Sequence, residues 1–177
     1  LLPRLNGFEL LMAPYTMAHA KLDLLLKETG YQPHKPKRFN IYLTNSLEEH
    51  HPDTQTLFAN WLSAEANAAN AIKRDAPIMV VLGNPPYAVS SANASIGADG
   101  KKTWIGALLD EYKKDLNEKK LNLDDDYIKF IRYGHHLIEK NHEGILAYIS
   151  NNSFLDGVTH RQMRKALLVT FDKVYIL

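Results

Sequence analysis

The part of this 177-residue sequence best suited to chemistry is one short segment, Asn84-Pro85-Pro86-Tyr87. An amine on a nucleobase is a poor nucleophile because its lone pair is delocalised into the ring. Two hydrogen-bond acceptors aimed at its two N–H bonds favour a geometry in which the lone pair is freed. Asn84 offers a side-chain oxygen, and Pro85 offers a main-chain carbonyl whose direction the proline rings restrict. Tyr87 supplies a flat face on which a flipped-out base stacks.

The same segment is also an ordinary way to open a turn, with the tyrosine as packing. Its position favours the chemical interpretation. It directly follows residues 78–82, a continuous apolar run typical of a central parallel strand buried on both faces. In an open parallel sheet, ligands bind beyond the carboxyl ends of the strands. Residues 84–104 have little periodicity, so we expect an active-site loop there.

Strand-like and helical segments alternate along the chain and must position this loop. Strands are expected at 8–12, 39–43, 78–82, 145–149 and 174–177. Helices are expected at 15–28, 54–73, 104–116, 127–141 and 159–170. The alternation predicts an α/β fold with a doubly wound, mostly parallel sheet and helices on both of its faces.

Composition restricts the partners and the cellular compartment. The net charge of +1 gives no general case for a nucleic-acid binder, so DNA phosphates would need a local basic patch or residues outside the chain. Lysine pairs at 101–102, 113–114 and 119–120 are either such a patch or solvated charge. The chain has no cysteine, which excludes disulfides and favours a cytoplasmic location. No apolar run approaches the roughly 18 residues of a membrane span, so no membrane partner is expected.

The eight histidines do not predict a metal site. The pairs at 50–51 and 135–136 are adjacent, and adjacent side chains on a helix do not face one another. His136 and Glu139 are three residues apart, but no further ligand follows with metal-site spacing. Packing or surface roles are therefore expected for these histidines.

The Asn84–Tyr87 segment resembles the motif IV signature of the gamma-type amino-methyltransferases, chiefly DNA adenine-N6 methylases. The chain is most similar to the methyltransferase region of large single-chain restriction-modification enzymes. The other similar segments are 7–10 with 14–18 for motif II, 41–47 for motif III, 126–132 for motif V and 144–155 for motif VI and beyond. The resemblance implies a partial Rossmann-like class I fold over residues 1–177. It also implies that S-adenosylmethionine is used to methylate N6 of a flipped adenine in double-stranded DNA.

The resemblance assigns the target side of the site to residues 84–87 and to three residues further along the chain. Asn84 and Pro85 would accept from the amine, and Tyr87 would stack on the base. The residues that would line the target pocket are Pro86, Tyr127, Phe130 and Asn151. Aromatic residues on an amphipathic helix are commonly core, and an asparagine after a strand commonly caps the next helix, so these alternatives stay open.

The cofactor side is assigned to Glu9, Leu10 and Asn45. Glu9 would accept from the ribose hydroxyls, or it is a solvated strand-end carboxylate. Leu10 would contact the adenine, or it is core. Asn45 stands where many relatives carry an aspartate, and it either accepts from the adenine amine or caps a turn.

One expected part is missing from the sequence. No glycine-rich loop precedes Glu9, although the family binds the methionine part of the cofactor with one. The chain also begins and stops within strand-like segments, so we expect a piece of a larger polypeptide that is inactive alone. The resemblance implies that the remainder includes nuclease, translocase and target-recognition parts.

Two other functions are compatible with the sequence. The same four-residue motif occurs in enzymes that methylate glutamine side chains of proteins, although the long insert after Tyr87 argues against this. The missing glycine-rich loop instead favours a non-catalytic, DNA-binding remnant of a methylase fold.

Overall fold

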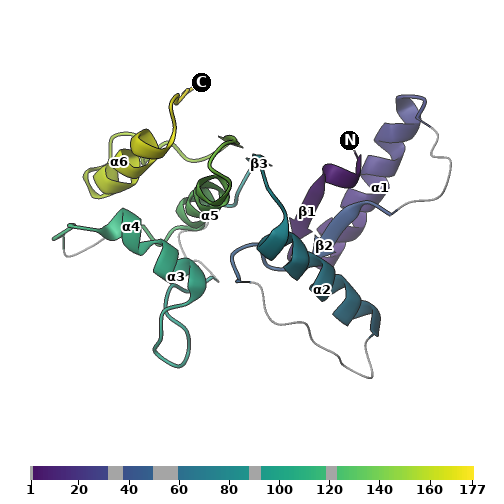
Figure 1. The fold of residues 1–177 in the computed structure, drawn as a ribbon, viewed down its shortest axis with the longest axis horizontal. Helices are drawn as coiled ribbons and strands as arrows, with labels where there is room; N and C mark the ends of the chain where they lie inside the picture. Colours follow the sequence, from purple (N-terminus) through teal and green to yellow (C-terminus); the bar gives the residue numbers. More distant parts are fainter. Residues whose placement is uncertain (1, 32–37, 50–59, 88–92, 119–122) are drawn as a thin grey trace. The chain divides into compact units, whose positions relative to one another are not determined.

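The computed structural model describes residues 2–31, 38–49, 60–87, 93–118 and 123–177. The chain folds as two compact units, Leu1–Ala76 and Pro77–Leu177 (Figure 1). Each unit contains a pair of parallel strands and the helices that connect or cover them. Within the described residues, no helix is both long enough and apolar enough to cross a membrane.

The first unit is a β-α-β crossover followed by a second helix. Its elements are η1 Leu2–Arg4, β1 Asn6–Glu9, α1 Met12–Glu28, β2 Asn40–Leu43 and α2 Asn60–Asp75. β1 and β2 pair in parallel, in a register that places Asn6 opposite Asn40 and Glu9 opposite Leu43. Parallel neighbours require a crossover connection, which α1 supplies.

The boundaries of β1 and α1 differ from the sequence prediction. β1 ends at Glu9, and α1 begins at Met12, so Pro14 lies in the first helical turn. Proline is tolerated there because the first N–H groups of a helix have no partner within the helix. The helix ends at Glu28, and Gly30, two residues beyond, has φ of 75° and donates its N–H to the carbonyl of Lys27 over 3.0 Å. A left-handed residue at this place commonly terminates a helix.

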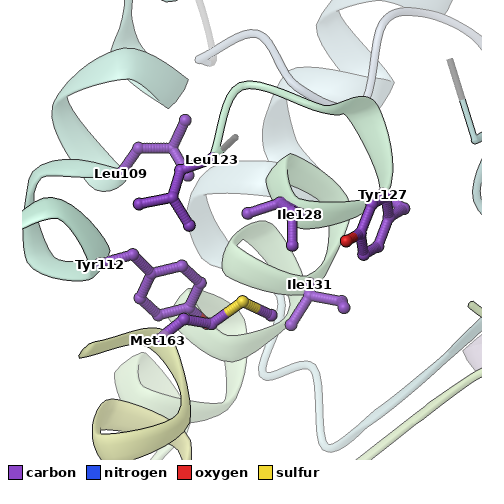
Figure 2. Close-up of a cluster of buried hydrophobic side chains, with 7 residues drawn as sticks. All are labelled: Leu109, Tyr112, Leu123, Tyr127, Ile128, Ile131 and Met163. Carbon is purple, nitrogen blue, oxygen red and sulfur yellow. The ribbon is translucent and has the colours of Figure 1, made fainter. Parts of the chain in front are cut away.

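The second unit surrounds one long helix. Its elements are β3 Val80–Gly83, α3 Trp104–Leu108, α4 Asp110–Lys113, α5 Asp126–Asn141, β4 Ile145–Tyr148, η2 Val158–His160 and α6 Arg161–Thr170. β3 and β4 pair in parallel, with Val80 opposite Ile145 and Gly83 opposite Tyr148. Figure 2 shows the buried core, which consists of Leu109, Tyr112, Leu123, Tyr127, Ile128, Ile131 and Met163.

Helix α5 supports one face of the β3–β4 pair. Gly134 permits this close approach, because a Cβ atom there would lie 2.5 Å from Cδ1 of Leu146. Val81 and Tyr148 line the same contact. The position of α5 against these strands therefore depends on the absence of a side chain at residue 134.

Three other expectations need correction. The strand expected at 78–82 forms at Val80–Gly83, and only one face is covered within its unit, since Leu82 is 72% exposed. The helix expected over 104–116 is divided into α3 and α4. Residues 174–177 are exposed and form no strand, because no described strand lies beside them to pair with. Part of the helix expected at 54–73 lies outside the described residues, and α2 covers the rest.

Candidate functional site

The Asn84–Tyr87 segment lies where β3 ends. The N–H of Ile149 donates to the carbonyl of Gly83 over 3.0 Å, which carries the parallel ladder up to the residue before Asn84. The ring of Tyr87 is about half exposed, and its hydroxyl donates to Oδ1 of Asn84 over 3.0 Å. That hydroxyl also lies 3.4 Å from the main-chain oxygen of Ile149. The segment is thus tied to the ends of both strands of the pair.

Two possible acceptors stand side by side in this segment. Asn84 is exposed, and its side-chain oxygen has two acceptor positions, of which Tyr87 occupies one. Pro85 is buried, so its ring is fixed by packing as well as by its own covalent geometry. Chemically, the pair can accept from a donor group with two N–H bonds while the tyrosine ring covers an adjacent flat surface.

Tyr127 and Phe154 join the first turn of α5 to the segment after β4. Tyr127 is 2% exposed and belongs to the hydrophobic core (Figure 2). Its ring centroid lies 6.5 Å from that of Phe154, and its hydroxyl hydrogen-bonds the side chain of Ser153. Burial raises the pKa of Tyr127 despite that hydrogen bond. Phe130, one turn further along α5, is half-buried.

Asn151 caps a local turn. Its side-chain oxygen accepts from the N–H of Ser153 over 2.7 Å and from the Ser153 hydroxyl. This is the geometry of an asparagine that stabilises the start of a turn, one of the two alternatives considered for it. The turn leads into the segment that packs on Tyr127.

On the first unit, Glu9 ends β1 and points at the start of α1. Its Oε1 accepts from the main-chain N–H groups of Leu10 and Leu11 over 2.9 and 3.0 Å. Negative charge at a helix start is favourable, so these contacts hold the carboxylate in place. Leu10 beside it is 55% exposed. A fixed carboxylate thus lies next to an exposed apolar side chain at the end of β1.

Asn45 shapes the turn after β2. Its Oδ1 accepts from the N–H of Leu47 over 3.0 Å, and its Nδ2 donates to Oε1 of Glu48 over 3.2 Å. The side chain therefore caps the turn, as in the second alternative considered for it.

Sequence reasoning missed Lys73, which supports this turn from the last turn of α2. Its ammonium donates to the main-chain oxygens of Asn45 and Glu48 over 2.6 and 3.2 Å, and to the hydroxyl of Thr44 over 3.3 Å. Burial lowers the pKa of Lys73, and the charge of Glu48 partly opposes this shift. Its position at a helix end is also that of an ordinary surface lysine, so the sequence carries no signal for this role.

One cluster in the second unit has the residue types of a metal site, but its side chains are engaged in ion pairs and hydrogen bonds with other residues. Ligand atoms of Glu111, His135 and Glu139 lie within 4.8 Å of one another. Arg132 pairs with Glu111 over 2.6 Å and with Glu139 over 2.9 Å, so a guanidinium already bridges the two carboxylates.

The histidine in this cluster is also engaged. The two ring nitrogens of His135 lie 3.0 Å from the hydroxyl of Tyr112 and 2.7 Å from that of Thr170. His135 is fully buried, which is the packing role expected from its sequence context. The pair at 50–51 lies outside the described residues.

Two of the described lysines after the loop, Lys102 and Lys113, pair with aspartates. Lys102 lies 2.6 Å from Asp110, and Lys113 lies 3.0 Å from Asp124. These aspartates offset the positive charge. The lysines at 119–120 fall outside the part of the chain that the structure describes.

Comparison with known proteins identifies the family. A family model described as Eco57I restriction-modification methylase matches residues 6–174. No curated protein matches the chain.

Solved structures resemble the chain over nearly its whole length. A nuclease-deletion mutant of the Type ISP restriction-modification enzyme LlaGI, in complex with a DNA substrate mimic, has a TM-score of 0.71 and 21% identity over 94% of this chain and 14% of its own. The ATP-dependent Type ISP enzyme LlaBIII bound to DNA has a TM-score of 0.71 and 26% identity over 92% of this chain and 11% of its own.

A third structure, a DrdV–DNA complex, has a TM-score of 0.68 and 27% identity over 94% of this chain and 16% of its own. The chain thus shares a fold with part of each of these much longer chains and spans only 11% to 16% of their lengths.

Proposed function

The chain belongs to the Eco57I restriction-modification methylase family, and from that premise we propose that it methylates the N6 amine of adenine in DNA with S-adenosylmethionine. The observation that carries the proposal is the Asn84–Tyr87 segment at the carboxyl end of β3, tied by Tyr87 to the end of β4. The proposed substrate is double-stranded DNA with the target adenine flipped out of the helix. This reaction would take place in the cytoplasm as part of a restriction-modification system.

We further propose that residues 1–177 are part of a class I methyltransferase domain with a doubly wound sheet. The parallel β1–β2 and β3–β4 pairs support this, since parallel strands joined by helices are the repeating unit of such a sheet. The remainder of a larger polypeptide would supply the glycine-rich loop and the nuclease, translocase and target-recognition parts. DNA in the LlaGI, LlaBIII and DrdV structures supports DNA as the partner.

On the target side, the proposed mechanism assigns one task to each residue of the segment. Oδ1 of Asn84 and the carbonyl of Pro85 accept from the two N–H bonds of the adenine amine, which turns its lone pair away from the ring. The ring of Tyr87 stacks on the base, a contact worth roughly 1–3 kcal/mol. Pro86 limits the freedom of the backbone between them. Tyr127, Phe130 and Asn151 support the pocket from α5 and from the segment after β4.

On the cofactor side, Glu9 would hold the ribose hydroxyls and Leu10 the adenine ring. Asn45 would act by capping the turn that Lys73 supports. When bound, S-adenosylmethionine supplies an electrophilic methyl group. These residues form only part of its site, because no glycine-rich loop precedes Glu9 in the sequence. We therefore expect weak or no S-adenosylmethionine binding to the isolated 177-residue chain by calorimetry, and tight binding would contradict this account.

The test uses the intact protein that carries this domain, radiolabelled S-adenosylmethionine and genomic DNA that lacks N6-methyladenine. We expect the label in N6-methyladenine, and sequencing of the modified DNA then gives the target site. Asn84→Ala should abolish transfer while cofactor binding stays near the wild-type value. Asn117→Ala, at an exposed asparagine outside the segment, is the matched control.

Each other outcome rejects a stated part of the proposal. Unchanged DNA methylation in Asn84→Ala would remove the role of that side chain. A label in protein and not in DNA would select glutamine methylation. No transfer by the intact wild-type protein to either substrate would select a non-catalytic, DNA-binding remnant.

A further inference from the structure

We propose that Lys129 is a positioning residue of the target site, which it serves by holding the main chain where the loop that starts at the Asn84–Tyr87 segment rejoins helix α5. This inference rests on the proposed function. Lys129 lies in the first turn of α5, and Asn93 is the first residue that the structure describes after the loop.

The first observation is the burial of Lys129. The residue is 1% exposed, and its ammonium donates to the main-chain oxygen of Asn93 over 2.6 Å. Lysine is almost never fully buried without compensation, because removing the charge from water is unfavourable. Burial lowers the pKa of Lys129, and the carboxylates of Asp124 and Asp126 oppose this shift. The carboxylates thus help to retain the charge inside the fold, where the ammonium binds the main chain of Asn93.

The second observation is that Asn93 is held twice from the same helical turn. Its Nδ2 donates to Oδ1 of Asp126 over 3.3 Å, and Asp126 is 5% exposed. Lys129 binds the main chain of Asn93 and Asp126 binds its side chain. Two residues further on, the hydroxyl of Ser95 donates to Asp124. Residues 93–95 of the loop are therefore attached to α5 and to the residues before it by three hydrogen bonds.

The third observation is that the same turn of α5 also contacts the segment that follows β4. Tyr127, between Asp126 and Lys129, packs on Phe154 and hydrogen-bonds Ser153 in the segment after β4. One turn of α5 thus contacts both the loop that follows β3 and the segment that follows β4. Asn84 and Tyr87 lie at the shared end of these strands. A small misplacement of reacting groups can cost about 100-fold in rate, so loosening this turn should affect the reaction without touching the base.

The experiment compares Lys129→Met with wild type in the intact protein. Methionine keeps most of the apolar stem but cannot donate to Asn93. The probe is a duplex of the target site, mapped from the methylation products, with 2-aminopurine in place of the target adenine. We expect kcat to fall by about 10- to 100-fold and the fluorescence increase on base extrusion to decline. The affinity for S-adenosylmethionine should stay within about two-fold of the wild-type value.

Lys140→Met is the matched control, since Lys140 is an exposed lysine in the last turn of the same helix. It should leave kcat and the fluorescence signal at wild-type values. If Lys129→Met does not fold, Asn93→Ala and Ser95→Ala replace it, because each removes one side-chain attachment of the same loop residues to Asp126 or Asp124 without changing α5. Each should reduce the extrusion signal below that of wild type.

The failures are distinguishable. If the intact wild-type protein transfers no methyl group to DNA, the proposed function fails and this inference fails with it. If wild type methylates DNA but Lys129→Met keeps its kcat and its extrusion signal, only the positioning role is overturned. If Lys129→Met loses affinity for S-adenosylmethionine by the same factor as it loses kcat, the positioning role is also overturned, because a general structural defect would then explain both losses. Wild-type signals in both loop variants would reject it as well.

Discussion

The hydroxyl of Tyr87 donates a 3.0 Å hydrogen bond to the side-chain oxygen of Asn84, so the proposed stacking ring and the proposed amine acceptor are held as a pair. The oxygen of an amide accepts two hydrogen bonds, which leaves a second position for an amine. The bond is exposed, and it orients Asn84 more than it stabilises the fold. The ring and the hydroxyl of Tyr87 therefore have separable roles.

Two substitutions at Tyr87 separate these roles. Tyr87→Phe keeps the ring and removes one exposed hydrogen bond, so we expect kcat/KM for DNA methylation to fall by about five-fold, equivalent to roughly 1 kcal/mol. Tyr87→Ala also loses stacking, worth roughly 1–3 kcal/mol, and should fall by a further 5- to 150-fold. Steady-state methylation of the mapped duplex measures both. Equal defects in the two variants would show that the hydroxyl, and not the ring, carries the effect.

Substitution of Glu65, a buried polar residue of the first unit, should lower the stability of the chain. Its Oε1 accepts from the N–H of Leu43 at the end of β2 over 2.9 Å, and its Oε2 pairs with Arg38 over 2.7 Å. Glu65→Ala leaves the N–H of Leu43 without its acceptor. We expect the free energy of unfolding of the 177-residue chain to fall by about 1–3 kcal/mol, measured by urea denaturation.

Glu65→Gln is the matched variant, because its amide oxygen still accepts from Leu43. Its loss of stability should be smaller than that of Glu65→Ala. An alanine variant as stable as wild type would show that α2 is attached to β2 by apolar contacts alone.

His135 should make the stability of the second unit depend on pH. Burial lowers its pKa, the charge of Glu139 opposes this shift, the charges of Arg132 and His136 add to it, and the resulting pKa is about 4. An unfolded histidine has a pKa of about 6.5, so below that pH the unfolded chain binds a proton that the folded chain does not. The free energy of unfolding should therefore fall as the pH is lowered from 6.5 towards 4. At pH 5 the loss from His135 alone is about 2 kcal/mol.

Urea denaturation of the 177-residue chain at pH 7.5 and pH 5 measures this dependence. His135→Gln keeps hydrogen-bonding atoms for Tyr112 and Thr170 but does not titrate, so its stability should change less between the two pH values. An identical pH dependence in wild type and His135→Gln would contradict the assignment.

Gly106 should tolerate no side chain. A Cβ atom there would overlap the main-chain oxygen of Ser95, and the main-chain carbon of Ser95 would lie 2.9 Å away. Backbone cannot rotate aside as a side chain can, so Gly106→Ala should destabilise the chain by about 3 kcal/mol, at the upper end for overpacking. Thermal unfolding measures the effect. Ala107→Ser, at the exposed neighbour on α3, should change the stability by no more than about 0.5 kcal/mol.

The local elements and the position of the Asn84–Tyr87 segment could be predicted because their signals are local. A run of apolar residues indicates a strand, and the residues that follow it in a parallel sheet lie at the ligand-binding edge whatever the packing elsewhere. The start of α1 was misplaced for an equally local reason, since Pro14 is compatible with either a strand end or a first helical turn.

The polar contacts that support the site could not be predicted. Lys129 meets Asn93 across 36 residues, and Lys73 meets Asn45 across 28. A lysine on a helix has the same sequence signature whether its ammonium reaches water or a distant carbonyl. The ion pairs of Arg132 with Glu111 and Glu139 could not be predicted for the same reason, because only the fold brings these three side chains together.

The sequence by itself determined the alternation of strands and helices and the resemblance to amino-methyltransferases, and it predicted the segment proposed to bind an amine. Periodicity and the order of residue types along the chain are enough for these. Only the tertiary structure decided that Tyr127 is core, that Asn45 and Asn151 cap turns, and that one turn of α5 contacts both Asn93 and Phe154. Those outcomes depend on which groups meet after folding, and burial is decided by neighbours that are distant in the sequence.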